Sequence, residues 1–127
     1  MYKELIISIV IIIIIIIADN VTQNYTKKTV QDICSNAETL KKSLQEKDDK
    51  KIEESLSELE EKLNKTHDNL EYYIEHDEIE NVETNFIECK SLAKSGNYDL
   101  SISKLEKIAF ILDHIADKYS FSLENIF

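Results

Sequence analysis

Residues 5–18 read LIISIVIIIIIIIA, which is fourteen residues without a charge, seven of them consecutive isoleucines. Each isoleucine favours the bilayer interior by a few tenths of a kcal/mol, so the run favours insertion by roughly 5 kcal/mol in total. In water the same run would be prone to aggregate. The predicted membrane segment consists of Leu5, Ile6, Ile7, Ile9, Val10, Ile11, Ile12, Ile13, Ile14, Ile15, Ile16, Ile17 and Ala18.

The apolar run is short for a membrane span. As a helix it is about 21 Å long, against a hydrocarbon thickness of about 30 Å, which is also typical of a signal-peptide core. Lys3 can reach the headgroups and so help a short span to fit. Ala18 is the only small residue at the end of the run, and Ile16 stands where a signal peptidase prefers a small one. We therefore prefer an uncleaved anchor to a cleaved signal peptide. The anchor comprises residues 1–21, and a domain of residues 22–127 follows it.

The orientation of this anchor follows from its position rather than from its charges. Lys3 on one side of the run competes with Lys27 and Lys28 on the other, so lysine counting does not decide the topology. A short hydrophobic run at the N-terminus is the commonest export device. We expect a single-pass protein of the cell membrane with its C-terminal domain outside the cytoplasm.

The composition of the chain favours helices and excludes some partners. There is no proline and one glycine, so few residues interrupt a helix, and an all-β fold is unfavoured. The formal net charge is −10, from 25 acidic residues against 15 lysines and arginines. Such a surface repels nucleic-acid phosphates and anionic lipid headgroups. We expect no nucleic-acid partner.

Apolar residues recur at alternating spacings of three and four in four later stretches, which is the pattern of helices that bury one face. The four sets are Val30, Ile33, Ala37, Leu40 and Leu44; Ile52, Leu56, Leu59, Leu63, Leu70 and Ile74; Ile79, Val82, Phe86, Cys89 and Ala93; and Ile102, Leu105, Ile108, Leu112 and Ile115. The predicted fold is all-α: an N-terminal transmembrane or signal-anchor helix followed by an antiparallel bundle of about four helices. A long parallel coiled-coil dimer is the alternative.

Local signals place the helix ends. Asp48 and Asp49 can cap a helix that starts after a turn at Lys47, and residues 95–97, Ser-Gly-Asn, form the clearest turn. The Gly96 turn argues against the coiled coil. Residues 20–28 are polar and are interpreted as a linker or a frayed extension.

Two further helix starts carry a capping-box pattern. Thr29 with Asp32 three residues later is predicted to open the first bundle helix, and Asp77 with Glu80 the third. A kink near His76 is the alternative to a full break there. The apolar tail, with Phe121, Leu123, Ile126 and Phe127, is expected to fold back onto the bundle.

Histidines and acidic residues offer weak catalytic or metal-binding signals. A di-iron bundle needs Glu three residues before His, whereas His67, His76 and His114 are preceded there by Asn64, Tyr73 and Ile111. A pair of His76 and Glu80 at helical spacing is more often a solvated face than a metal site. The cluster of Glu75, Asp77, Glu78, Glu80 and Glu83 surrounds a helix start, where acids favour the helix dipole. We expect no catalysis, no metal and no cofactor.

The two cysteines, Cys34 and Cys89, lie on or beside the apolar faces of the first and third bundle helices. A disulfide is conceivable if those helices are neighbours outside the cytoplasm. We prefer the interpretation that both are small buried hydrophobic residues. Without a Cys-x-x-Cys motif, a redox enzyme has no support.

The second half of the chain resembles the bacterial DUF4363 family. The resemblance is carried by His76-Asp77-Glu78-Ile79 with Val82-Glu83, by Leu112-Asp113-His114-Ile115, and by the closing Leu123-Glu124-Asn125-Ile126-Phe127. It implies one N-terminal membrane segment and a helical extracytoplasmic remainder, with no catalytic or binding residues to carry over. A tryptophan expected in the second helix is absent, and Tyr72 or Tyr73 occupies its place.

The leading functional hypothesis is a membrane-anchored structural or interaction module that contacts another membrane protein. The alternatives are a metal-binding or redox enzyme of the cell envelope and a secreted helical protein released after Ala18. The sequence leaves the oligomeric state open.

Overall fold

The structure is a computed structural model that describes residues 1–70 and 74–119. In these ranges the chain forms four helices: α1 (Tyr2–Glu46), α2 (Asp49–Leu70), α3 (His76–Lys94) and α4 (Tyr98–Tyr119). The predicted all-α class is confirmed. Two expectations concern residues outside the described ranges: that Tyr72 or Tyr73 takes the place of a tryptophan, and that the apolar tail folds back onto the bundle.

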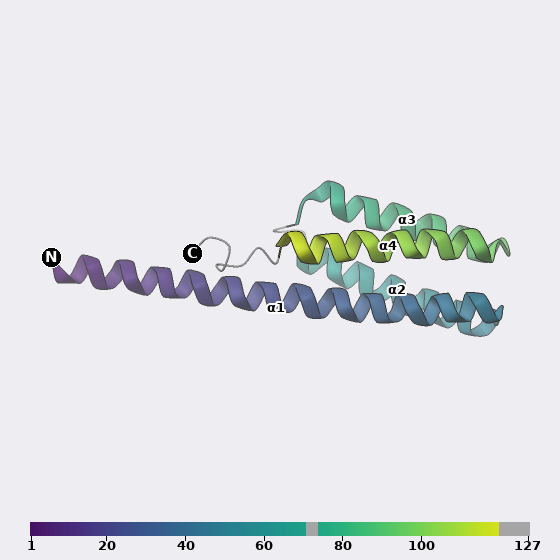
Figure 1. The fold of residues 1–127 in the computed structure, drawn as a ribbon, viewed down its shortest axis with the longest axis horizontal. Helices are drawn as coiled ribbons and strands as arrows, with labels where there is room; N and C mark the ends of the chain where they lie inside the picture. Colours follow the sequence, from purple (N-terminus) through teal and green to yellow (C-terminus); the bar gives the residue numbers. More distant parts are fainter. Residues whose placement is uncertain (71–73, 120–127) are drawn as a thin grey trace.

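The four helices pack as an up-and-down bundle, with consecutive helices antiparallel (Figure 1). Contacts between α3 and α4, α1 and α2, and α1 and α4 are extensive, whereas those between α2 and α3 are sparser. Helices α1 and α3 therefore lie across a diagonal of the bundle. Only the second half of α1 belongs to the bundle, and its first half projects beyond it as a single helix (Figure 1).

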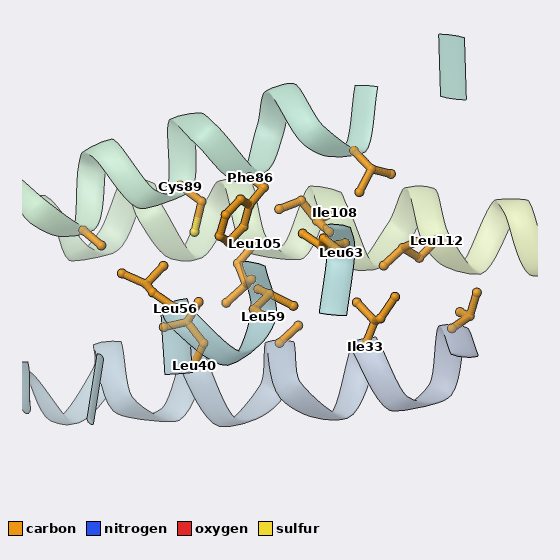
Figure 2. Close-up of a cluster of buried hydrophobic side chains, with 14 of the residues drawn as sticks. Ile33, Leu40, Leu56, Leu59, Leu63, Phe86, Cys89, Leu105, Ile108 and Leu112 are labelled. Carbon is orange, nitrogen blue, oxygen red and sulfur yellow. The ribbon is translucent and has the colours of Figure 1, made fainter. Parts of the chain in front are cut away.

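The core consists of the predicted apolar faces. Among the residues whose side chains the structure describes, nineteen hydrophobic ones are buried, from all four helices and from Ile74, and Leu40, Leu59, Cys89 and Ile108 are 0% exposed. Figure 2 shows their side chains meeting between the helices. Of the predicted apolar positions, Ile102 is only partly buried, and the side chain of Leu70 lies outside the description. One chain thus buries its own apolar faces, in contrast to the coiled-coil dimer.

Both predicted turns are present. Lys47 has a positive φ of 56°, and the Lys51 N–H donates to Asp48 Oδ1 at 3.3 Å, so Asp48 caps α2. Gly96 has a φ of 81°, which a glycine adopts without strain, and Asn97 N–H donates to the Leu92 carbonyl at 2.9 Å. These turns bring α2 back along α1 and α4 back along α3.

The interpretation of residues 20–28 as a linker is wrong, because α1 runs without a break from Tyr2 to Glu46. Thr29 and Asp32 accordingly open no helix. The segment contains no proline or glycine, and extending an existing helix is far easier than nucleating one. Most of its polar residues are exposed on the helix surface, whereas Thr26 is buried, and none of them interrupts the helical backbone.

The start of α3 agrees with the prediction to within one residue, but its capping differs. The N-cap is Glu75 and not Asp77, and no side chain caps the helix. Glu75 has an extended backbone, with ψ at 133°, so α3 is separated from α2 by a break and not by a kink. The predicted capping box of Asp77 and Glu80 is therefore wrong.

Candidate membrane anchor and protein-contact surface

The apolar run of α1 packs against nothing in the described structure. Its hydrophobic side chains, except that of Ile16, are 47–60% exposed, which is high for a continuous set of isoleucines. Among the described residues, α1 is the one helix long and apolar enough to cross a membrane, and its most apolar window is 0% buried. The run therefore lies on a free helix, as a membrane span or a signal sequence would.

The helix then enters the bundle through a short set of polar contacts. Gln23 donates to Asp19 at 2.9 Å, and the Thr26 hydroxyl donates to the Thr22 carbonyl at 2.9 Å, both within α1. Asn69 of α2 donates to the Tyr25 hydroxyl at 2.9 Å. The apolar run ends at Ala18 and the hydrophobic core begins at Val30, so eleven residues of helical backbone join them, with no flexible linker between.

The three histidines lie apart. His67 Nδ1 of α2 is 2.5 Å from Glu83 of α3, whereas His76 is 3.9 Å from Glu80 on an exposed face. His114 is exposed on α4. Within residues 1–70 and 74–119, no three His, Cys, Asp or Glu side chains form a group that could hold a metal.

His67 and Glu83 border a cavity of about 30 Å³ at the end of the core nearest to the isoleucine run. Its other walls are mostly aliphatic and include Val30, Leu63 and Ile115. Metabolite pockets measure about 300–1,000 Å³, so this space holds at most one or two waters. It is a packing defect between side chains of all four helices.

Both cysteines are free and lie in different surroundings. Cys89 is buried beside Ser101, 3.3 Å from its hydroxyl, and burial raises the pKa of its thiol. Cys34 is half-buried on the α1 side facing α4, and its thiol pKa is raised by burial and by the carboxylates of Asp113 and Glu38. A raised pKa opposes nucleophilic or redox use of either thiol.

Part of the predicted acidic cluster is tied to α4. Lys118 contacts Glu78 at 3.0 Å and Glu75 at 3.2 Å, and these hydrogen bonds raise the pKa of the lysine. The pairs join the start of α3 to the end of α4.

A second surface feature was not predicted from the sequence. Between α1 and α4 lies a groove of about 290 Å³ with Phe110 at its edge, and this phenyl ring is 74% exposed. Phe110 lies two residues past Ile108, outside the apolar face of α4. A bulky apolar residue off the periodic face is the one sequence signal that could have indicated this surface.

Comparison with known proteins gives a family match over most of the chain. No curated protein and no solved structure matches the chain. A family described as "Domain of unknown function (DUF4363)" matches residues 20–126, a range that contains α2, α3, α4 and the bundle half of α1. The expected resemblance is confirmed. Since the match covers most of its length, the chain belongs to the DUF4363 family.

Proposed function

We propose that the protein is a single-pass membrane-anchored module whose bundle stands outside the cytoplasm and acts by contacting another membrane protein, without catalysis. One observation carries the proposal: a single helix is exposed along its isoleucine run and buried within the core further on. Such a helix holds the bundle at a fixed place relative to the bilayer. The fold then provides a defined position of the bundle near the membrane and not a catalytic site.

The exposed run supports the membrane part of the proposal. Half-exposed isoleucines gain little from folding in water, whereas a bilayer removes them from water. The gain of roughly 5 kcal/mol on insertion is comparable to the stability of a small domain. Lys3 and the polar residues after Ala18 are suited to the two headgroup regions.

The separation of the histidines and the raised thiol pKa values favour an interaction role over a metal-binding or redox enzyme. A catalytic site needs titratable groups that converge on a pocket. In the described part of the chain, His67 and Glu83 reach only a cavity too small for a substrate, and His76 and His114 lie on exposed faces away from it. No three His, Cys, Asp or Glu side chains of these residues could hold a metal. The alternative interpretation of the apolar run is a signal peptide that is cleaved after Ala18 and releases the bundle. Mass spectrometry of the mature N-terminus distinguishes this cleaved form from an uncleaved anchor.

Membrane fractionation of the full-length chain tests the proposal. We expect the protein to stay in the membrane pellet after alkaline carbonate extraction and to dissolve in mild detergent. The double variant Ile12→Lys/Ile14→Lys should shift it to the soluble or aggregated fraction, because each lysine costs about 3 kcal/mol at a helix centre. Ile87→Lys is the control, since Ile87 is 66% exposed on the bundle. A wild-type chain extracted by carbonate would overturn the anchor.

A further inference from the structure

The groove between α1 and α4 has an apolar floor. It is lined by Cys34 and Ala37 of α1 and by Leu105, Ala109 and Phe110 of α4. Ala37 is buried beneath the groove, whereas Ala109 is partly exposed, and its small side chain lets another helix approach α4 closely. A helix could lie between α1 and α4 with Phe110 against its side.

Phe110 is the most exposed large hydrophobic side chain of the described bundle, since the more exposed Met1 and Tyr2 lie on the projecting part of α1. Full burial of a phenylalanine is worth about 1.5–3 kcal/mol, and this gain is unused in the single chain. Exposed aromatic residues beside a pocket are typical anchors of protein interfaces.

The rim of the groove is negative. Glu106 is held by Lys41 at 3.2 Å, which neutralises one acid. Glu38 and Asp113 also line the groove, and neither makes an ion pair within residues 1–70 and 74–119. Burial raises the pKa of the Cys34 thiol, and the nearby carboxylates of Asp113 and Glu38 raise it further. Two uncompensated carboxylates beside an apolar floor favour a cationic occupant.

Two other occupants fit the groove poorly. The first is the bilayer: Cys34 lies sixteen helical residues beyond Ala18, which is about 24 Å along α1, and anionic headgroups would be repelled. The second is another copy of the chain. Copies anchored in one membrane place their grooves at the same height, so Glu38 and Asp113 of each would face those of the other.

We infer that the α1–α4 groove, with Phe110 as its apolar anchor and Glu38 and Asp113 as its charged rim, binds a basic amphipathic helix of a partner membrane protein. The inference rests on the proposed function and names the surface that performs it. The partner helix would bury apolar side chains against Phe110 and Ala109 and place lysine or arginine beside Glu38 and Asp113.

A pair of synthetic peptides tests the inference on the full-length chain in zwitterionic nanodiscs. Each is an amphipathic helix of about 18 residues, or five turns, with leucine on one face and either lysine or glutamate on the other. We expect the lysine peptide to bind and to slow alkylation of Cys34, and the glutamate peptide to do neither. Empty nanodiscs measure binding to lipid alone.

Matched variants separate the groove from general attraction to an acidic protein. Glu38→Gln/Asp113→Asn should weaken binding of the lysine peptide by about tenfold or more, and Phe110→Ala should weaken it similarly. Glu58→Gln/Glu61→Gln removes the same two charges from the exposed face of α2 and should change binding by no more than about twofold. Ile87→Ala is the control for Phe110.

Three outcomes would overturn the inference. The first is equal weakening by the groove and α2 variants, and the second is binding that leaves Cys34 alkylation unchanged. The third is concentration-dependent self-association that Phe110→Ala abolishes, which would assign the groove to a second copy. If the chain stays in the membrane pellet after carbonate extraction but shows one of these results, only the inference about the groove is overturned. If carbonate extracts the chain, both the proposed function and this inference are overturned.

Discussion

The Ser101 hydroxyl donates a hydrogen bond of 2.8 Å to the Cys89 carbonyl oxygen and lies 3.3 Å from the Cys89 sulfur, which joins α4 to α3 inside the core. Both residues are 0% exposed, so no water can replace this contact. A hydroxyl is tolerated at such a position only because protein atoms satisfy it. The bond helps to fix the position of α4 along α3 just after the Gly96 turn.

Ser101→Ala should destabilise the bundle by about 1 kcal/mol, because the methyl group keeps the packing but removes the hydrogen bond. Urea unfolding of the full-length chain in mild detergent measures the change. Ser103→Ala, two residues away on the exposed side of α4, should stay within about 0.5 kcal/mol of wild type. A Ser101→Ala chain as stable as the Ser103→Ala chain would show that the bond contributes nothing.

Leu40→Ala should cost about 2–5 kcal/mol in free energy of unfolding, since Leu40 is 0% exposed at the centre of the core and its removal leaves a cavity. The matched control is Leu100→Ala, because Leu100 is 52% exposed at the start of α4. We expect the control to cost less than about 1 kcal/mol. Equal losses in the two variants would contradict the placement of α1 in the core.

Periodicity predicted the bundle because a helix that buries one face must repeat apolar residues at that spacing. The predicted apolar positions from Val30 to Leu44 on α1 and from Leu105 to Ile115 on α4 follow this spacing, and all of them are buried. The same reasoning failed at residues 20–28, since polar composition does not distinguish an exposed helix from a linker. Nor did it predict the groove: Glu38 and Asp113 are far apart in the sequence, and only the packing of α1 on α4 brings them to one rim.

Cys34 should react slowly with iodoacetamide near neutral pH, and its rate should rise steeply with pH. Burial and the carboxylates of Asp113 and Glu38 raise its thiol pKa, which lowers the thiolate fraction. Asp113→Asn should speed the reaction, whereas Asp99→Asn, exposed at the start of α4, should not. Mass spectrometry resolves Cys34 from the buried Cys89. A rate equal to that of a free thiol would contradict the negative groove.

The bundle should lose stability at alkaline pH partly through Tyr98. Its hydroxyl donates to Asp49 at 2.6 Å, and this hydrogen bond raises the pKa of the phenol. The folded state holds the proton more tightly than the unfolded state, so the stabilisation is complete below the ordinary pKa of about 10. It is lost as the pH rises through the raised value.

Tyr98→Phe should therefore flatten the pH dependence of unfolding in this alkaline range, while Tyr2→Phe, far from the bundle, should not. Denaturant melts at several pH values measure the effect, and phenolate absorbance follows the titration. An unchanged pH dependence in Tyr98→Phe would show that the phenol does not titrate differently on unfolding.

The continuity of α1 predicts slow hydrogen exchange between the anchor and the bundle. Amides of residues 19–28 should exchange at least about tenfold more slowly than those of an unstructured peptide, because each is bonded within the helix.

Thr22→Pro should remove that protection locally, since proline lacks an N–H and breaks the helix, at a cost of about 3 kcal/mol. Amides of residues 30–44 in the same variant serve as the internal control and should stay protected, because the core begins there. Mass spectrometry of the full-length chain in nanodiscs reads both segments at once. If residues 19–28 of the wild-type chain exchanged at the rate of a free peptide, the segment would be a linker, and the bundle would not be rigidly joined to the isoleucine run.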